Sequence, residues 1–171
     1  MNFRFAEQRD LKSIVQIYNQ AIKAGNTTAD IREIKVLDRE AWFLEHTNDT
    51  YPIYVLELNN KIIGWGSLSA YRKNREGLKE TAEISYYIDY EYHGQGFGKK
   101  LIEFMILDCK RLRIKNLFAL LLDINKKSTL ILERFGFVKW GFMPDVANLK
   151  GTRCGHLIYG LKVNTANEIL N

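Results

Sequence analysis

The chain has few cysteines and no long apolar run. Its two cysteines among 171 residues, Cys109 and Cys154, lack the spacing of metal ligands, and a reducing compartment does not favour a disulfide between them. We therefore expect free thiols or small packing residues there, and no metal site. No apolar run approaches the ~20 residues of a membrane span, and the opening MNFRFAEQRD contains no apolar signal segment. These absences favour a cytoplasmic protein that does not enter a membrane.

The composition is that of an ordinary soluble domain. Hydrophobic residues make up 46% and charged residues 26% of the 171 positions, which suits one domain with a single core. The net charge is +5, but basic residues are scattered among acidic ones. A polyphosphate ligand or an acidic substrate explains this excess as well as nucleic acid does. No repeat or linker is present, so we expect a single domain over residues 1–163 and a frayed tail over 164–171.

Hydrophobic periodicity predicts an α/β (α+β) fold with a mixed, mostly antiparallel sheet of about six or seven strands flanked by about four helices. Residues 59–60, both asparagine, indicate a hairpin turn, and residues 71–80 form a charged stretch expected to be a solvated loop. The expected strands are 3–5, 51–58, 61–70, 81–89, 117–122, 137–142 and 155–163, and the expected helices are 10–24, a short helix from 38, 101–113 and 125–135.

The strand at residues 81–89 has one apolar and one polar face. Successive side chains of a strand alternate between the two faces of the sheet. Ala82, Ile84, Tyr86 and Ile88 therefore point one way, and Thr81, Glu83, Ser85 and Tyr87 point the other way.

A glycine-rich loop follows this strand and precedes a helical segment. Residues 93–100 read HGQGFGKK, with glycine at 94, 96 and 98. Glycine accepts positive φ and leaves room for close approach, so successive N–H groups can converge on a phosphate at the start of the helix. The nucleotide-triphosphate loop and the dinucleotide fingerprint both require other spacings. An ordinary tight turn is the alternative interpretation.

The loop resembles motif A of the GNAT family of N-acetyltransferases, with His93 in the position usually held by Gln or Arg. A second segment, NKKSTLILERFGF at residues 125–137, is similar to a later motif of that family. The resemblance implies a GNAT-like single domain in which two splayed central strands form a cleft for acetyl-CoA. It also implies contacts to the pantetheine arm, the pyrophosphate and the later part of acetyl-CoA. The implied cofactor-binding residues are Tyr86, Tyr87, Ile88, His93, Gly94, Gln95, Gly96, Phe97, Gly98, Lys99, Asn125 and Ser128.

Acetyl transfer to an amine requires removal of a proton from the ammonium group before it attacks the thioester, and a carboxylate is a common base for this step. Glu83 lies on the polar face of the strand before the loop. A free Glu titrates near ~4.3, so Glu83 must be partly desolvated, or act through water, to work at neutral pH. The backbone N–H of Tyr87 is our candidate donor to the tetrahedral oxyanion. An exposed strand carboxylate without a catalytic role is the alternative for Glu83. For Tyr86 and Tyr87 the alternative is that they are strand aromatics only.

Within the family, the chain most resembles phosphinothricin and methionine sulfoximine N-acetyltransferases, which implies Glu83 as base and a homodimer. Those enzymes bind the acceptor with two arginines, of which this chain keeps Arg72. Leu132 stands where many acetyltransferases place a Tyr that is thought to protonate the leaving thiolate, so no acid is carried over. His156 is displaced from the subfamily's His and is expected to be structural.

Three alternatives stay open from the sequence. The acceptor site could have been lost, which would leave a non-catalytic acyl-CoA sensor. A protein N-terminus, a lysine or a polyamine could replace the small acceptor. Nucleic-acid binding rests only on the net charge of +5, and the expectation is that the chain does not bind nucleic acid.

Overall fold

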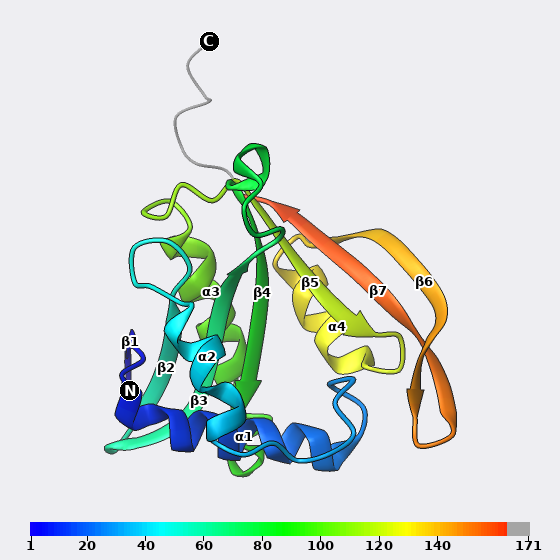
Figure 1. Ribbon diagram of the computed structural model, residues 1–171, viewed down its shortest axis with the longest axis horizontal. Coiled ribbons are helices and arrows are strands. Elements are labelled where there is room, and N and C mark those ends of the chain that lie inside the picture. The colour runs from blue at the N-terminus through cyan, green and yellow to red at the C-terminus, as the bar shows by residue number, and fades with distance from the viewer. Residues whose placement is uncertain (164–171) are drawn as a thin grey trace.

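A computed structural model describes residues 1–163, and the expected tail at 164–171 lies outside the described residues. Seven strands form one mixed sheet in the order β1-β2-β3-β4-β5-β7-β6 (Figure 1). Neighbouring strands are antiparallel except β4 and β5, which are parallel. The strands are β1 Asn2–Phe5, β2 Ile53–Leu58, β3 Lys61–Ala70, β4 Thr81–Ile88, β5 Asn116–Leu122, β6 Val138–Leu149 and β7 Thr152–Lys162. The α-helices are α1 Leu11–Ala24, α2 Leu37–Leu44, α3 Phe97–Asp108 and α4 Lys126–Arg134.

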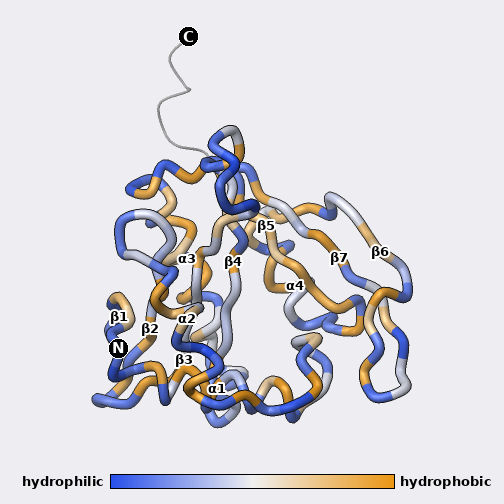
Figure 2. The backbone as a smooth tube through the Cα atoms, viewed as in Figure 1, coloured by the Kyte–Doolittle hydropathy of each residue, from blue (hydrophilic) through white to orange (hydrophobic). Residues whose placement is uncertain are grey.

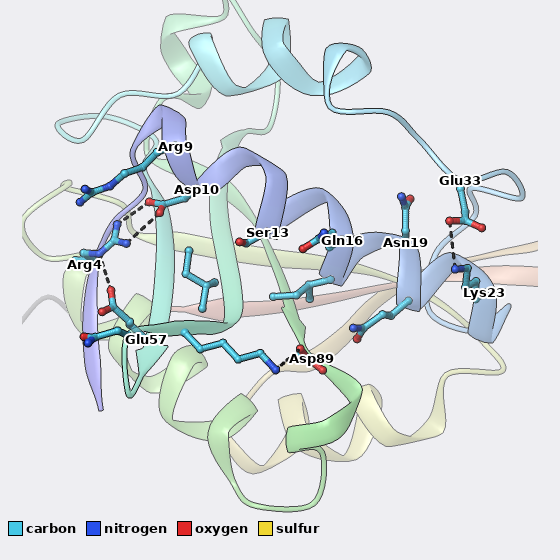
Figure 3. Close-up of a pocket in the computed structure, with 15 residues that line it drawn as sticks. Arg4, Arg9, Asp10, Ser13, Gln16, Asn19, Lys23, Glu33, Glu57 and Asp89 are labelled. Carbon is cyan, nitrogen blue, oxygen red and sulfur yellow. Dashed lines mark hydrogen bonds and ion pairs between the residues drawn. The ribbon is translucent and has the colours of Figure 1, made fainter.

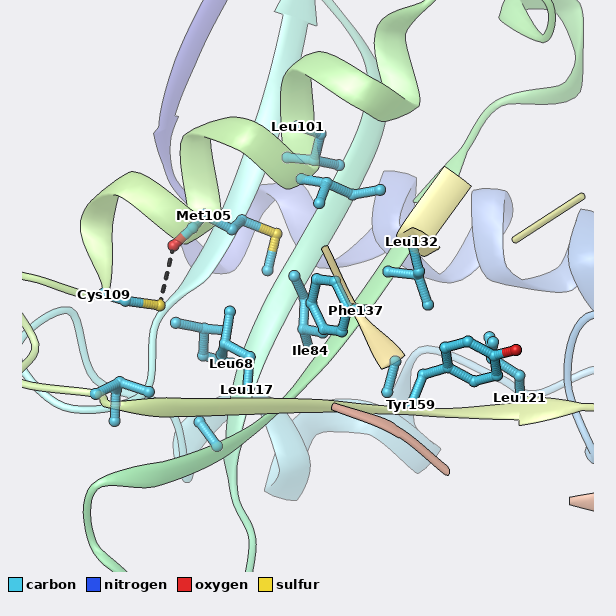
Figure 4. Packing of buried hydrophobic residues seen from close by; sticks show 14 of the residues in the cluster. Leu68, Ile84, Leu101, Met105, Cys109, Leu117, Leu121, Leu132, Phe137 and Tyr159 are labelled. Atoms are coloured by element: carbon cyan, nitrogen blue, oxygen red, sulfur yellow. Dashed lines mark hydrogen bonds between the residues drawn. The ribbon is translucent and has the colours of Figure 1, made fainter. Parts of the chain in front are cut away.

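Helices cover both faces of this sheet, as the α/β (α+β) prediction requires (Figure 1). The apolar stripe of α1 packs with part of α2 on one face, where its partners include Ile53, Val55 and Trp65. Leu101, Ile102 and Met105 of α3 pack on the opposite face with Leu132 of α4 (Figure 4). Ala82 and Ile84 of β4 belong to this second cluster. The predicted alternation of β4 side chains is therefore confirmed.

Local backbone geometry agrees with the turn residues. Asn59 and Asn60 have φ of 50° and 61°, as a two-residue hairpin turn between β2 and β3 requires. The charged loop at residues 71–80 is largely exposed, and it is strongly hydrophilic in Figure 2. Among residues 1–163, no helix combines the length and the apolar character that a bilayer span needs.

The predicted bounds of three elements are wrong. Strand β6 continues to Leu149, well beyond the predicted end at 142, and β7 begins at Thr152, before the predicted start at 155. The two strands form one hairpin closed at Lys150 and Gly151. Register shifts between Lys139 and Gly141 and between Met143 and Ala147 break the alternation of β6, so period-2 patterning could not reveal it. Helix α3 begins four residues earlier than predicted, since the glycine loop itself supplies its first turn.

Candidate active site

Strands β4 and β5 diverge in the middle of the sheet. Their parallel ladder runs from Thr81 opposite Asn116 to Glu83 opposite Phe118, where it ends. Beyond that point β4 continues beside β3 as far as Ile88, and β5 continues beside β7. Within the described residues, the edge of β4 that faces β5 has no strand partner after Glu83. We call the divergence of the two strands beyond Glu83 the gap, and the backbone groups of β4 along it have no hydrogen bonds from a neighbouring strand.

The register with β3 fixes which backbone groups face the gap. The N–H of Asp89 donates to the carbonyl of Ile63 at 2.8 Å. The carbonyl oxygen of Tyr87 also points at β3, because it lies 3.1 Å from the position that a Cβ atom would take on Gly64. Since hydrogen-bonded and non-bonded pairs alternate along an antiparallel ladder, odd-numbered residues of β4 direct their N–H and C=O groups at β3.

The prediction that the N–H of Tyr87 donates to the oxyanion is therefore wrong, because this group lies in the β3–β4 ladder. Tyr86 and Ile88, the even-numbered neighbours, direct their backbone groups at the gap instead. The carbonyl of Ile88 accepts a hydrogen bond from the His93 ring at 2.8 Å, which fits this direction. Of the three residues predicted to contact a ligand through the backbone, only Tyr86 and Ile88 direct backbone groups at the gap.

The glycine loop ends in an open helix N-terminus. Gly94 and Gly96 have φ of 78° and 82°, and Gly96 is the N-cap of α3. A Cβ at either position would meet no atom within 4 Å. The first intrahelical bond is from Lys100 N to Gly96 O at 3.3 Å, so the N–H groups of residues 97–99 precede it. These donors and the helix dipole favour an anion at this end of α3.

Side chains of the loop have separate tasks. Gln95 donates to the carbonyl of Glu91 at 3.3 Å, and the His93 ring donates to the carbonyl of Ile88. Both hydrogen bonds stabilise the conformation of the loop. Lys99 and Lys100 are exposed, and the first turn of α3 contains no acidic residue. The positive character that an anion requires is thus preserved.

The N-terminus of α4 lies on the same side of the sheet. Asn125 is buried, and its side-chain oxygen accepts from the backbone N–H of Ser128 at 3.2 Å. Asn125 is thus the N-cap of α4. The side chain of Tyr86 extends from β4 toward this turn, because even-numbered β4 side chains face α3 and α4. Leu132 is fully buried one turn later (Figure 4).

A cavity of about 320 Å³ opens on the opposite face of the sheet, under α1 and α2. Its polar floor comes from the odd-numbered residues of β4 and their neighbours on β3. Its wall brings together α1, the α1–α2 loop, α2, β5 and β7. The lining residues are Tyr18, Thr27, Thr28, Ala29, Arg39, Trp42, Trp65, Ser67, Ser69, Glu83, Ser85, Tyr87, Leu120, Leu122 and His156.

Glu83 is the acidic residue of this cavity. Burial raises the pKa of its carboxyl group above the ordinary value. No ion pair or hydrogen bond within residues 1–163 opposes that effect at the carboxylate. This desolvation moves the pKa of Glu83 in the direction that a carboxylate base at neutral pH requires. It lies where the β4–β5 ladder ends, at the junction of the cavity and the gap.

Aromatic side chains form one wall of the cavity. Tyr87 stacks on Trp65 with ring centroids 4.8 Å apart and meets Tyr18 edge-on at 5.0 Å. The guanidinium of Arg39 lies 4.7 Å from the Tyr18 ring centroid and 5.4 Å from that of Trp42. These contacts position a cation against the aromatic wall of the cavity.

The structure does not bring Arg72 to this cavity. Arg72 is exposed and lies 5.7 Å from the ring centroid of Tyr71, after the end of β3. The arginine that lines the cavity is Arg39, which the sequence analysis missed because only the packing of α2 against α1 brings it there. Its one sequence cue is the i, i+3 spacing to Trp42, which places both on one helix face. His156 also lines the cavity, and burial lowers the pKa of its ring.

A larger hollow of about 840 Å³ between α1 and the β2–β3 turn is a poorer candidate (Figure 3). Its charged groups pair with one another: Arg4 binds Asp10 at 2.6 Å and Glu57 at 3.0 Å, and Lys23 lies 3.3 Å from Glu33. The hollow includes neither Glu83 nor the glycine loop. Volume alone therefore does not identify the reactive site.

Comparison with known proteins assigns this arrangement to a family. Residues 11–137 match the model of the "Acetyltransferase (GNAT) family". A Bacillus subtilis (strain 168) protein with the name "Putative phosphinothricin acetyltransferase YwnH" is 36% identical over 95% of this chain and 96% of its own. The L-methionine sulfoximine/L-methionine sulfone acetyltransferase of Pseudomonas paraeruginosa (strain DSM 24068 / PA7) is 33% identical over 88% of this chain and 87% of its own.

Solved structures share the fold. The crystal structure of a GNAT superfamily phosphinothricin acetyltransferase from Sinorhizobium meliloti, in complex with AcCoA, superimposes with a TM-score of 0.87. It is 25% identical in sequence, and the match covers 95% of this chain and 88% of that chain. The splayed sheet is thus an arrangement that this chain shares with that acetyltransferase.

Proposed function

Because the chain belongs to the GNAT acetyltransferase family, we propose that it transfers the acetyl group of acetyl-CoA to the primary amine of a small, acidic acceptor. Phosphinothricin and methionine sulfoximine are the acceptor type that its relatives suggest. The observation that carries the proposal is the two-sided character of β4. An anion-binding loop and an unpaired strand edge lie on one side, and a desolvated carboxylate beneath a cavity lies on the other.

The residues around the gap fit acetyl-CoA. The open glycine loop and the N–H groups of residues 97–99 suit a pyrophosphate, with Lys99 nearby. The pantetheine arm contains two amides, which match the backbone groups of Tyr86 and the N–H of Ile88, whose carbonyl is already hydrogen-bonded to His93. Asn125 and Ser128 lie at the start of α4, across the gap. When bound, acetyl-CoA supplies the activated acetyl group, and the protein supplies position and proton transfer.

Glu83 acts as the general base in this proposal. Its carboxylate takes a proton from the acceptor's ammonium group, directly or through a water, so that the free amine can attack the thioester carbon. The raised pKa improves its match to a base working near neutral pH. A backbone donor to the oxyanion then comes from Tyr86 or Ile88 in place of Tyr87.

Arg39 takes the acceptor-binding role that the sequence assigned to Arg72. Its guanidinium lines the same cavity as Glu83, and Asp30 approaches it only to 3.6 Å, so further N–H donors remain for a carboxylate or phosphinate. An amino acid can then present its amine to Glu83 while Arg39 holds its acidic group. The aromatic wall of Trp42 and Trp65 suits the acceptor's apolar part.

A homodimer is part of the proposal. Strand β6 is an edge of the sheet, and it exposes a cluster of large apolar side chains among the described residues. An exposed apolar edge of this kind is typical of a surface that pairs with another chain. The exposed residues are Val138, Trp140, Phe142, Met143 and Val146.

A thiol-release assay tests the function. Acetyl-CoA is offered with phosphinothricin, methionine sulfoximine, free amino acids, polyamines and peptides, and each reaction is compared with one that lacks acceptor. We expect release that depends on an acidic amino-acid acceptor. Binding of acetyl-CoA without transfer to any acceptor would instead identify an acyl-CoA sensor, and faster transfer to polyamines or peptides would overturn the assignment of the acceptor.

A further inference from the structure

Tyr86 carries a buried hydroxyl group that the fold does not use. Its oxygen has no hydrogen-bond partner within the described residues. A buried donor left without a partner costs about 1–3 kcal/mol, so such groups call for an explanation. Burial raises the pKa of this phenol to about 12, although the neighbouring Ser128 hydroxyl partly opposes the rise. The phenol therefore keeps its proton and is a donor throughout the physiological range.

Ser128 connects this hydroxyl to the gap. It stands in the first turn of α4, it is partly exposed, and its backbone N–H is already bound to the Asn125 cap. Its own hydroxyl group remains as a donor beside the N-terminal end of the α4 dipole. Helix N-termini stabilise anions, including thiolates. Leu132, one turn further along α4, is apolar and fully buried and offers no donor.

The reaction leaves an anion close to this place. A thioester held between the glycine loop and Glu83 would place its sulfur along the unpaired part of β4, to which Tyr86 belongs. Resting on the function proposed above, we infer that the hydroxyl groups of Ser128 and Tyr86 act in series to stabilise the departing thiolate of coenzyme A. The Ser128 hydroxyl donates to the sulfur, and the Tyr86 hydroxyl donates to the Ser128 oxygen.

The atoms and charges balance without any further reactant. The amine nitrogen forms its bond to the carbonyl carbon, the carbon–sulfur bond breaks, and the electron pair of that bond goes to sulfur. The protons of the amine pass to Glu83 and to water. The hydroxyl groups lose no proton, because a free thiol titrates near ~8.5, well below a phenol. The thiolate leaves hydrogen-bonded and takes its proton from solvent after release.

Binding of the product separates this role from a structural one. Calorimetry compares coenzyme A with desulfo-coenzyme A, in which hydrogen replaces the thiol, for the wild type, Ser128→Ala, Tyr86→Phe and the double variant. Above the pKa of a free thiol, we expect the wild type to prefer coenzyme A by roughly tenfold to a hundredfold, as for hydrogen bonds to a charged group. Each single variant should lose most of this preference, and the double variant should lose no more than the stronger single variant.

The absorbance of the bound thiolate gives a second readout that does not depend on turnover. A pH titration of the coenzyme A complex should show the thiol ionising at lower pH than in free coenzyme A. In Tyr86→Phe the ionisation should return toward the value of the free thiol. The desulfo analogue, which has no thiolate band, is the blank.

A matched buried tyrosine is the control for folding. The hydroxyl of Tyr54 donates to Asp108 at 2.6 Å, so Tyr54→Phe should lower the thermal midpoint. In the free protein the Tyr86 hydroxyl has no hydrogen-bond partner within the described residues, and its bond to Ser128 belongs to the complex with the thiolate. The midpoint of Tyr86→Phe, measured without coenzyme A, should therefore stay the same or rise. A fall as large as that of Tyr54→Phe would overturn the inference, because it would show that the hydroxyl group supports the fold.

The two levels of the proposal fail differently. Wild-type protein that binds neither coenzyme A nor the desulfo analogue would remove the proposed function together with this inference. Wild-type protein that binds both equally well at every pH would keep the function and overturn only the hydroxyl series. A single variant that prefers coenzyme A as strongly as the wild type does would also overturn only the hydroxyl series. A buried water bound to Tyr86 would then account for the hydroxyl group that lacks a protein partner.

Discussion

Replacing Glu83 with Gln should move activity and stability in opposite directions. Glutamine keeps the shape of the side chain but cannot accept the ammonium proton. General-base catalysis contributes about 10²–10⁴-fold, so kcat/KM should fall by that factor while the affinity for acetyl-CoA stays the same. The carboxylate is partly buried and has no cationic partner within the described residues, so its loss should leave the fold at least as stable.

The pH dependence gives the sign of the stability effect. Burial raises the pKa of Glu83 in the folded chain above its unfolded value, so the folded state binds the proton more tightly. The free energy of unfolding therefore falls as the pH rises from the unfolded pKa, near ~4.3, through the folded pKa. Glu83→Gln should lack this decline and should be the more stable protein at neutral pH. The acidic limb of the wild-type kcat/KM profile should disappear with it.

Thiol release across pH and urea unfolding across pH measure the two effects. Glu76→Gln, in the exposed loop between β3 and β4, is the matched control and should change neither. Turnover of Glu83→Gln within about twofold of the wild type would refute Glu83 as the base. Lower stability of the variant at neutral pH would refute the picture of a carboxylate buried without a partner.

Three further predictions test other parts of the site. Gly96→Ala places a side chain at φ of 82°, which should cost about 1 kcal/mol of stability and weaken acetyl-CoA binding in calorimetry. Gly77→Ala is the control and should do neither, because the backbone of Gly77 does not have positive φ. Arg39→Gln should raise the KM for an acidic acceptor without changing the KM for acetyl-CoA, whereas Arg72→Gln should leave both KM values unchanged. The opposite pattern would show that Arg72, as the sequence predicted, binds the acceptor. Val146→Glu adds a charge to the exposed β6 edge, and sedimentation should show a monomer with a normal fold; an unchanged dimer would place the interface elsewhere.

Features encoded within single segments were predictable from the sequence. Alternation along residues 81–89 gave both faces of β4, because side-chain direction in a strand depends only on position along it. The glycine loop was recognisable because positive φ at Gly94 and Gly96 restricts the residue type. These local features also carried the resemblance to the family, which the comparisons confirm.

Features that depend on a second segment were not predictable. The backbone direction of Tyr87 follows from the register of β4 against β3, which no periodicity in β4 reports. The position of Arg39 depends on how α2 packs, and Arg72 was expected in the site only through a resemblance whose paired arginine is absent here. The length of β6 was hidden because its bulges interrupt the alternation. Bulges and register are properties of a pair of strands, so one strand's sequence specifies them weakly.

The account depends most on the claim that acetyl-CoA completes the unpaired edge of β4. Residue-resolved amide hydrogen exchange, with and without acetyl-CoA, tests this claim directly. We predict that the amides of Tyr86 and Ile88 and those of residues 97–99 become protected on binding, while that of Tyr87, already in the β3–β4 ladder, does not change. Protection of Tyr87 alone, or no change along β4 at saturating acetyl-CoA, would contradict the account.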